Sequence, residues 1–450
     1  MTGSQARRTL LPQGRARGLG KGRSKGLSSG FSSGFLKGLA RATTLAACAA
    51  FVAGCGVVPG ATGGSGGGPV TVMTWAPEKT AATNEPGMPA MAKAYARWIN
   101  ANGGINGREL KVLTCNDRNE TVAAAKCARR AAAQDVVAVV GSYSQHGRAF
   151  LAPLESAGIP YIGGYGVTDD EFASALSYPV NGGQAALMAG LGQQLSQACG
   201  PIALVRPDSI AGDQLPLLLD SGLRSGGHGR SADQLAAEDA TEYGGHAREA
   251  LRRATAEPAT EGCVVPALGD RTFTFMDSFR RDRADYPEVR TGTVIGSVDQ
   301  TVIDATGGAS GPYEGSYVTG WYPVEADERW DRMKAVIREH AFDDNRIDPA
   351  DPGVQTTWIA YTVLRAALEG IGEGEVTSQA IRHVLDNGLQ VDTGGLTPPL
   401  RWRFEDLIAS AGFPRLINPE VTFQIVREGQ LVAARRGFVD VEKTLIEAGD

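Results

Sequence analysis

The stretch WINANGGINGRELKVLTCNDRN, residues 98–119, places the end of a helix, a tight turn and a strand in direct succession. Apolar side chains recur at helical spacing just before and within it, which predicts a helix with one buried face; they are Met88, Met91, Tyr95, Trp98 and Ile99. Asn102-Gly103-Gly104 ends this helix, because glycine adopts the left-handed backbone of a helix C-terminus at little cost. ELKVLTC then predicts a strand.

The same alternation of strand and helix continues along the chain. Up to about residue 178 the strands VTVMTW, ELKVLTC, VVAVVGS and IPYIGGY alternate with helices, and a second series runs to about residue 317. A polar stretch up to about Tyr243 is assigned to no element. Apolar strands separated by helices predict parallel sheets with helices on both faces, so the fold class is α/β with two parallel-sheet lobes. A period-two hairpin with its turn near Glu428-Gly429 closes the chain.

Composition is that of a globular protein with room for more than one lobe. The chain has 450 residues, of which 42% are apolar and 21% are charged. No apolar run reaches the roughly 18 residues that a membrane-spanning helix needs.

The N-terminal region indicates export. Residues 1–41 carry nine positive charges, and the first acidic residue is Glu78. The apolar run ATTLAACAAFVAG, residues 42–54, follows, and a basic segment before a short apolar run is typical of an export signal. A disordered basic tail with a short helix is the alternative. Removal of residues 1–54 takes the formal net charge from −6 to −15, which argues against nucleic-acid binding.

Val52-Ala53-Gly54-Cys55 resembles the lipobox of bacterial lipoproteins. The resemblance implies a signal peptide over residues 1–54, cleavage before Cys55 and attachment of fatty acyl chains such as palmitate to this cysteine. Each buried CH2 group of such a chain contributes about 0.8 kcal/mol to membrane binding. The glycine-rich residues 55–69 would form a flexible tether. The expected location is the extracytoplasmic face of the cell membrane.

Four further cysteines lie in the expected globular part, and exported proteins can keep disulfides. Cys115 ends a strand and Cys127 lies in the next helix. From Cys115 the chain advances about five residues at about 3.3 Å each, and the helix then returns about seven residues at about 1.5 Å each. The two sulfurs therefore lie at similar heights along the strand direction, so a bridge is expected. Cys199 and Cys263 each precede a strand, and a bridge between them requires that these strands be parallel neighbours. Four separate buried thiols are the alternative.

No metal, cofactor or enzymatic activity is expected. The sequence has no CxxC motif, and its five histidines are scattered. Ser144 and His146 lie two residues apart, but no G-x-S-x-G elbow surrounds them. An extracellular α/β hydrolase is therefore the disfavoured competing class.

Residues 98–119 together with two α/β lobes and an export signal resemble the leucine/isoleucine/valine-type solute-binding proteins of bacterial ABC importers. The family's turn and strand pattern is matched by Ile99-Asn100, Gly103-Gly104-Ile105, Gly107, Leu110, Val112 and Asn116-Asp117. VVAVVGSYS is similar to the family's third strand and ligand loop, EGSYVTGWYP to its crossover between lobes and TTWIAYTVLRAAL to its late helix. The resemblance covers about residues 70–435.

The resemblance implies a type I periplasmic-binding fold, in which three segments join two lobes around a cleft. The crossing segments would lie near residues 177–180, 313–322 and 393–400. Lobe 1 would comprise 70–178 and 318–394, and lobe 2 would comprise 179–317 and 395–450. The implied function is capture of a small polar solute, amino acid-like or amide-like, for delivery to ABC permease subunits. A lipoprotein of the same fold that senses a ligand without transport is the alternative.

Candidate ligand contacts in lobe 1 follow the third and fourth strands. In the family the first of these loops holds the ligand's carboxylate, which here implicates Ser142, Tyr143 and Ser144; capping of the next helix is the alternative for the two serines. The second loop offers Gly164, Tyr165, Gly166 and Thr168. Tyr165 departs from the small residues usual in the family.

Candidate contacts in lobe 2 are acidic. Asp208 and Asp213 follow one strand, where the family often has an aromatic residue and this chain has Ile210. Asp299 follows another strand, where the family often offers an acid to a ligand's ammonium group. Helix capping is the alternative for all three aspartates. Trp75, at the end of the first strand, is a further candidate at the cleft edge.

Overall fold

The computed structural model describes residues 67–81, 83–257, 260–410 and 412–448. Five parallel strands form the first sheet, in the order β2-β1-β3-β4-β5. Their bounds are β1 Val70–Trp75, β2 Leu110–Cys115, β3 Ala138–Val140, β4 Tyr161–Ile162 and β5 Ser177–Tyr178. The apolar strands and the intervening helices of the sequence therefore fold as the alternation predicts.

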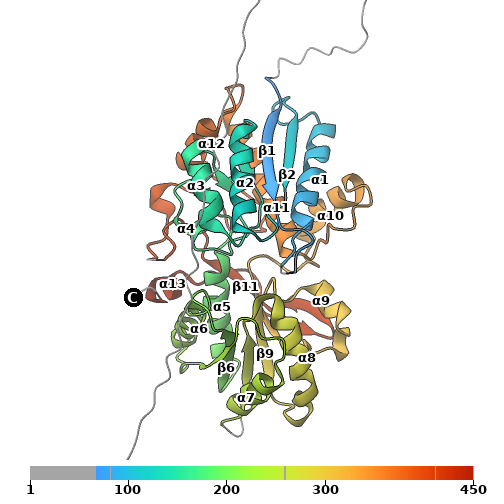
Figure 1. Cartoon of the computed structure of the whole chain (residues 1–450), viewed down its shortest axis with the longest axis vertical. Helices are drawn as coiled ribbons and strands as arrows, with labels where there is room; N and C mark the ends of the chain where they lie inside the picture. Colours follow the sequence, from blue (N-terminus) through green and yellow to red (C-terminus); the bar gives the residue numbers. More distant parts are fainter. Residues whose placement is uncertain (1–66, 82, 258–259, 411, 449–450) are drawn as a thin grey trace, which may run out of the picture. The chain divides into compact units, whose positions relative to one another are not determined.

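Helices cover both faces of the first sheet, and Figure 1 shows β1 and β2 with α1 and α2 on either side. Alternate residues of a strand point to opposite faces. Val72 thus packs in a core with α1 and α11, whereas Trp75 packs in a second core with α2 and α3. The helices are α1 Gly87–Ala101, α2 Thr121–Ala133, α3 Gly147–Ala157, α4 Asp170–Ala173, α10 Asp331–His340, α11 Pro352–Ile371 and α12 Ser378–Asp386.

The second sheet has eight strands, in the order β12-β11-β10-β9-β8-β6-β7, with β13 paired to β11. Strands β6 to β10 are parallel, and β11 runs antiparallel to β10 and β12. The bounds are β6 Ile202–Pro207, β7 Ala232–Ala236, β8 Cys263–Pro266, β9 Arg290–Val294, β10 Tyr317–Gly320, β11 Glu420–Arg427, β12 Gln430–Ala433 and β13 Val439–Asp440.

The helices of the second lobe include a close-packed pair, α5 and α6. A Cβ atom at Gly192 would lie 2.1 Å from the Leu219 carbonyl oxygen, and one at Gly222 would lie 2.1 Å from that of Ala189. Both glycines are therefore needed for this contact. The helices are α5 Gly183–Ser196, α6 Gln214–Ser225, α7 Gly244–Ala254, α8 Thr272–Asp282, α9 Gln300–Ala305 and α13 Glu442–Ala448, with short 3-10 turns η1 Gly269–Arg271, η2 Arg283–Asp285, η3 Gly308–Ser310 and η5 Phe404–Asp406. One further 3-10 turn, η4 Glu328–Trp330, belongs to the first lobe.

The structure confirms the predicted α/β class with two lobes built on parallel strands. The closing hairpin is also confirmed, since Arg427 pairs with Gln430 and the turn residues Glu428 and Gly429 have positive φ. One strand was missed, because β7 lies within the stretch that had been assigned to no element. It is a polar strand at the sheet edge, where exposed side chains replace the apolar pattern of a central strand.

The positions where the chain changes lobe differ from the expected boundaries at two of three crossings. The expected boundary at 317/318 divides β10, which is hydrogen-bonded within the second sheet. Trp321 and Trp402 pack in the first-lobe core, whereas Ile408 packs in the second. We therefore place the second and third changes of lobe after Gly320 and after Trp402.

Both expected disulfides are present. Cys115 at the end of β2 is bonded to Cys127 in α2, and Cys199 after α5 is bonded to Cys263 at the start of β8, each with a Cα–Cα distance of 5.8 Å. Strands β6 and β8 are parallel neighbours, which is the condition that the second bridge requires.

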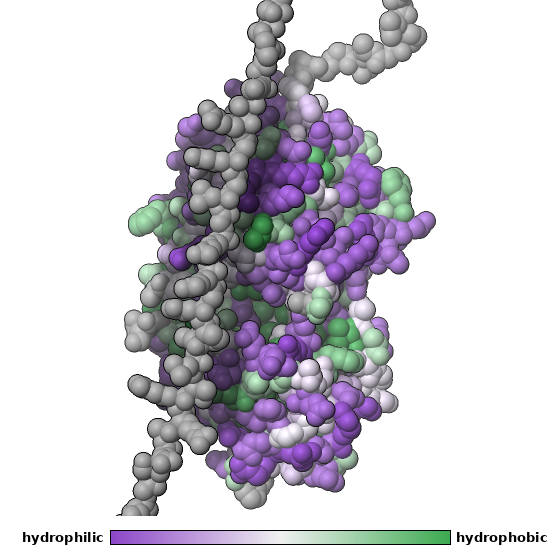
Figure 2. Space-filling view, viewed as in Figure 1, coloured by the Kyte–Doolittle hydropathy of each residue, from purple (hydrophilic) through white to green (hydrophobic). Residues whose placement is uncertain are grey.

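The expected signal peptide and Cys55 lie outside the described residues, as does the expected tether except for residues 67–69. Within the part of the chain that the structure describes, no helix is both long and apolar enough to cross a membrane. Figure 2 shows that hydrophilic residues dominate the visible face.

Candidate functional site

An aromatic cluster of Tyr143, Tyr165 and Trp321 lies beyond the carboxyl ends of the strands, which is where open α/β sheets bind ligands. Tyr143 follows β3, Tyr165 follows β4 and Trp321 follows β10. Ring centroids are 5.0 Å apart between Tyr143 and Tyr165 and 5.2 Å apart between Tyr165 and Trp321, both edge to face. The three side chains are 4%, 8% and 2% exposed. The fold thus brings together aromatic residues from three separate segments.

Tyr165 joins this cluster to the second lobe. A Cβ atom at Gly296, just after β9, would lie 2.6 Å from the Tyr165 hydroxyl oxygen, so the glycine makes room for the tyrosine. Among the described residues, the hydroxyl has no hydrogen-bond partner. Burial, followed by the negative charges of Glu85 and Asp351, raises the pKa of Tyr165 well above its usual range. The hydroxyl is therefore a protonated donor that is free to bind a ligand.

Three half-buried carboxyl groups, Glu85, Asp299 and Asp351, lie near Tyr165. Burial raises the pKa of Glu85, and the negative charges of Asp351, Asp270 and Asp299 raise it further. Burial also raises the pKa of Asp351 and of Asp299. Across the residues that the structure covers, no lysine or arginine forms an ion pair with any of the three. The three carboxyl groups therefore have no basic partner among the described residues, and each retains its proton more readily than an exposed carboxyl group does.

Helix starts hold two of these carboxyl groups. Asp351 Oδ1 accepts a hydrogen bond of 2.6 Å from the Gly353 amide, and Asp299 Oδ1 accepts one of 2.8 Å from the Val302 amide. Asp299 thus caps α9, the alternative considered for it, and its charge also acts on Glu85. A Cβ atom at Gly353 would lie 2.9 Å from Glu85 Oε2 and 3.0 Å from Asp351 Oδ1, so both carboxylates contact one glycine.

Sequence reasoning missed Glu85 and Asp351. The pair Asp351-Pro352 is a helix-start signal and could have marked the aspartate as a cap. No local signal marks Glu85, because its neighbours in the site come from distant parts of the chain.

The loop after β4 folds around an internal carboxylate, that of Glu171. Glu171 accepts hydrogen bonds from the amides of Gly166, Val167 and Thr168 at 3.2, 3.0 and 3.1 Å, and from the Thr168 hydroxyl at 3.3 Å. A Cβ atom at Gly164 would lie 2.1 Å from Glu171 Oε2. Glu171 is 2% exposed, and its burial raises its pKa to about 7. The donors predicted to bind a ligand therefore bind this side chain.

Ser142 and Ser144 are also engaged within the lobe. Ser142 Oγ accepts a hydrogen bond of 3.1 Å from the Trp75 amide. Ser144 Oγ accepts one of 3.2 Å from the His146 amide and is hydrogen-bonded to Asp117. Both hydroxyls are buried. They hold the loop between β3 and α3, whereas Tyr143 between them points to the aromatic cluster.

Trp75 and Asp208 lie apart from the aromatic cluster. The Trp75 ring is fully buried against Phe150 and Tyr161, with centroids 5.4 and 6.1 Å away, so it belongs to the core between the sheet and α3. Asp208 is exposed beyond β6, where its amide donates a 2.8 Å hydrogen bond to the Ala236 carbonyl. We leave both residues out of the proposed site.

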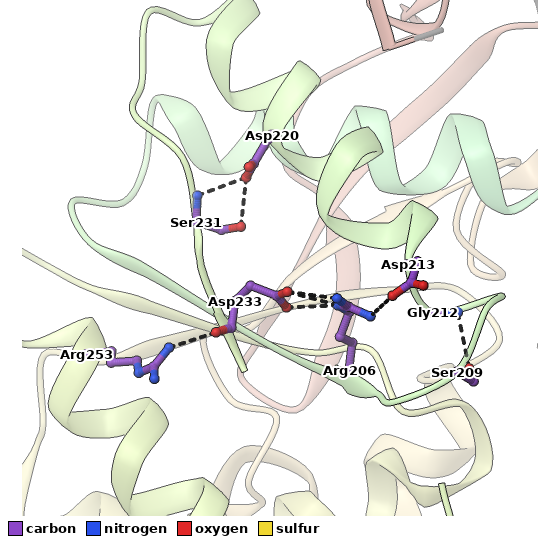
Figure 3. A network of polar contacts seen from close by, with 8 residues as sticks. All are labelled: Arg206, Ser209, Gly212, Asp213, Asp220, Ser231, Asp233 and Arg253. Carbon is purple, nitrogen blue, oxygen red and sulfur yellow. Dashed lines mark hydrogen bonds and ion pairs between the residues drawn. The ribbon is translucent and has the colours of Figure 1, made fainter. Parts of the chain in front are cut away.

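An ion-pair network beyond β6 involves the candidate Asp213, and Figure 3 shows how its members face one another. The buried Arg206 guanidinium pairs with Asp233 at 2.9 Å and with Asp213 at 2.8 Å. Both contacts raise the pKa of Arg206. This cation is therefore already neutralised and offers no charge to a solute's carboxylate.

Hydrogen bonds between side chains join the two lobes at the rim of the site. Thr83 Oγ1, in the first lobe, donates to the two Asp270 carboxylate oxygens of the second lobe at 2.8 and 2.7 Å. Within the first lobe, Gln145 Nε2 donates to the Tyr143 hydroxyl at 3.1 Å. Two further contacts between lobes are Gln214 to Asp169 and Thr301 to Asp348.

A cavity of about 30 Å³ lies next to the hinge, and its lining includes Tyr322, Gln300, Gln355 and Gln424. Gln424 is 2% exposed and its Oε1 has no hydrogen-bond partner among the described residues. This volume suits about one water molecule. A solute of amino acid size therefore requires movement of the surrounding segments.

In the described ranges, no group of three or more His, Cys, Asp or Glu could hold a metal ion.

Comparison with known proteins supports this architecture. A sequence profile described as periplasmic binding protein matches residues 79–408. No curated protein matches the sequence.

Solved structures of similar fold cover most of the chain. A substrate-binding periplasmic protein from Ralstonia solanacearum is 15% identical, with a TM-score of 0.62 over 81% of this chain and 99% of its own. A possible leucine/isoleucine/valine-binding protein from Rhodopirellula baltica SH 1 is 13% identical, with a TM-score of 0.65 over 81% and 96%. A solute binding protein of an ABC transporter from Rhodopseudomonas palustris BisB5, in complex with 3,4-dihydroxy benzoic acid, is 13% identical, with a TM-score of 0.64 over 83% and 97%.

These likenesses identify the type I periplasmic-binding fold, and the profile covers well over half of the chain. The protein therefore belongs to the periplasmic binding protein family.

Proposed function

We propose that this protein is a lipid-anchored, extracytoplasmic solute-binding protein that captures a small polar solute between its lobes and delivers it to an ABC importer. The observation that supports this proposal best is the meeting of Tyr143, Tyr165 and Trp321 with carboxyl groups from both lobes. The aromatic rings supply apolar contact area, and the carboxyl groups accept hydrogen bonds from an amino or amide group. The proposal includes no catalytic step.

Direct binding tests the site. Asp299→Asn removes the charge of Asp299 but keeps a residue that caps helices well, so α9 is expected to persist. Binding of a solute identified by a thermal-shift screen of amino acids, amides, amines and aromatic acids should weaken in this variant, because ligand binding raises the melting temperature by mass action. Asp440→Asn is the matched control, since Asp440 Oδ1 likewise accepts a hydrogen bond from the start of a helix, at the Glu442 amide. An equal shift in both variants and the parent protein would place the solute elsewhere.

Anchoring is tested by fractionation. Cys55→Ala should release the protein from membranes, because the acylated thiol is the proposed attachment point. Cys48→Ala, in the same apolar run, should leave it membrane-bound. Release of both variants, or of neither, would contradict a specific anchor at Cys55.

Delivery to an importer is tested in cells. Deletion of the gene should abolish uptake of the radiolabelled solute. Unimpaired uptake together with tight binding would favour the sensing alternative.

A further inference from the structure

The donors that this fold places for a solute's carboxylate are occupied by the protein itself. Three backbone amides of the loop after β4 point to Glu171, at 3.0 to 3.2 Å. The Ser142 hydroxyl donates to the Val140 carbonyl oxygen at 3.4 Å, and the Ser144 hydroxyl acts as a hydrogen-bond donor to Asp117. A carboxylate that entered here would compete with an internal carboxylate already held at four hydrogen bonds.

Arg206, a basic side chain near the carboxyl end of β6 in the second lobe, is also engaged. Arg206 pairs with both Asp213 and Asp233 and is 7% exposed. A desolvated carboxylate needs a cation or several donors as partners, because an unpaired buried charge costs several kcal/mol. Neither Arg206 nor the amides of the loop after β4 are available to an acidic solute.

The carboxyl groups of the site, two of which also accept hydrogen bonds from helix starts, favour a cation. Glu85 Oε2 and Asp351 Oδ1 both contact Gly353, and in the described residues no lysine or arginine pairs with either. Asp299, from the second lobe, is close enough for its charge to act on Glu85. Together these carboxyl groups line one side of the site, and because a nearby positive charge favours the ionised form of a carboxyl group, a bound cation would offset the burial and repulsion that raise their pKa values.

The aromatic cluster supplies a second, independent indication. The Tyr165 ring packs edge to face against Tyr143 and against Trp321, and all three residues are more than nine-tenths buried. Faces of such rings attract organic cations. The Tyr165 side chain is 8% exposed, and its hydroxyl oxygen, which forms no hydrogen bond within the described residues, lies beside Gly296 in the second lobe. This oxygen is not among the fully buried unpaired polar atoms of the described residues, so it is accessible and can form a hydrogen bond with a polar guest at this position.

We propose that the solute is a small organic cation, an amine or quaternary ammonium compound without a carboxylate, held by Glu85, Asp299 and Asp351 against the rings of Tyr143, Tyr165 and Trp321. This inference rests on the proposed function and narrows its solute class. An amino acid would satisfy the carboxyl groups through its ammonium group but would leave its own carboxylate unpaired beside Glu171.

Matched sets of compounds test the proposal by isothermal titration calorimetry on the full-length protein. One set is tyramine, tyrosine and 3-(4-hydroxyphenyl)propionate, and another is isoamylamine, leucine and 4-methylpentanoate. A pair with a quaternary ammonium group is choline and glycine betaine. Within each set the compounds share a skeleton and differ in the ammonium and carboxylate groups. The cation without carboxylate should bind at least about tenfold more tightly than its partners.

Two variants connect the binding to the named residues. Asp299→Asn and Glu85→Gln should weaken binding of the cation by about tenfold to a hundredfold, the range for losing one charged hydrogen-bond partner. Asp440→Asn should leave it unchanged, and circular dichroism should show that all three variants are folded.

The outcomes separate this inference from the proposed function. Tighter binding of an amino acid or an acid than of the matching amine would overturn the cation proposal while solute capture stands. Amine binding that is unchanged in both site variants would overturn it as well. If no compound of these sets or of the wider screen binds, solute capture at this site and the cation proposal both fail.

Discussion

Replacement of Glu171 by glutamine should remove one component of the protein's pH-dependent stability. The Glu171 carboxyl has a pKa of about 7 in the folded protein, raised chiefly by burial, against a usual value of 4.5. Between these values the unfolded chain has lost the proton while the folded chain still holds it. Stability contributed by this group therefore decreases as pH rises from about 4.5 to about 7, and it stays low above that range.

The magnitude follows from the pKa difference. A difference of about 2.5 pKa units corresponds to about 3 kcal/mol, at 1.36 kcal/mol for each unit. A glutamine side chain has no proton to lose at these pH values. Its NH2 group, however, would replace one of the two carboxylate oxygens and would face either the Gly166 amide or the amides of Val167 and Thr168, so that two hydrogen-bond donors would oppose each other. We expect the variant to be less stable than the parent at pH 5 and to recover by about 2.5 kcal/mol relative to the parent between pH 5 and pH 8.

Urea unfolding followed by tryptophan fluorescence at pH 5, 6, 7 and 8 measures this difference. Glu155→Gln is the control, because Glu155 is an exposed glutamate of the same lobe that accepts a hydrogen bond from Ser174. Parallel pH profiles for the parent and Glu171→Gln would refute the reasoning. If the parent instead gains stability relative to the variant as pH rises, the hydrogen bonds from the three amides lower the pKa of Glu171 by more than burial raises it.

Further predictions concern the cross-link, the core and the rim of the site. Replacing Cys115 and Cys127 by alanine should lower the free energy of unfolding by about 3 kcal/mol, the loop-entropy value for a separation of 12 residues, and an unchanged urea midpoint under oxidising conditions would contradict this. Trp75→Ala should cost about 3–5 kcal/mol of stability but leave solute affinity within about threefold, since the ring lies in the core; a larger loss of affinity measured on folded protein would return Trp75 to the site. Thr83→Val removes the donor to Asp270 and should weaken solute binding by about two- to tenfold in calorimetry with unfolding unchanged, whereas full affinity would show that this contact does not stabilise the bound state.

The sequence by itself determined the order of strands and helices and the class of the fold. Helical spacing from Met88 to Ile99, the glycines after it and the apolar strand ending at Cys115 all appear where expected. These signals are local, because backbone geometry sets the periodicity with which a helix or strand buries one face. The disulfide from Cys115 to Cys127 was predictable for the same reason, since strand and helix rise fix the heights of the two sulfurs.

Only the tertiary structure decided which groups at the strand ends are free. Tyr143, Tyr165 and Asp299 were predicted in the site and lie near one another. Trp75 was predicted there too, but its side chain packs in the core between the first sheet and the helices α2 and α3. The loop after β4 carries the expected donors, yet a residue a few positions further along accepts their hydrogen bonds. Whether a polar group is available to a ligand depends on its partners in space, and a sequence records the presence of donors and acceptors but not their pairing.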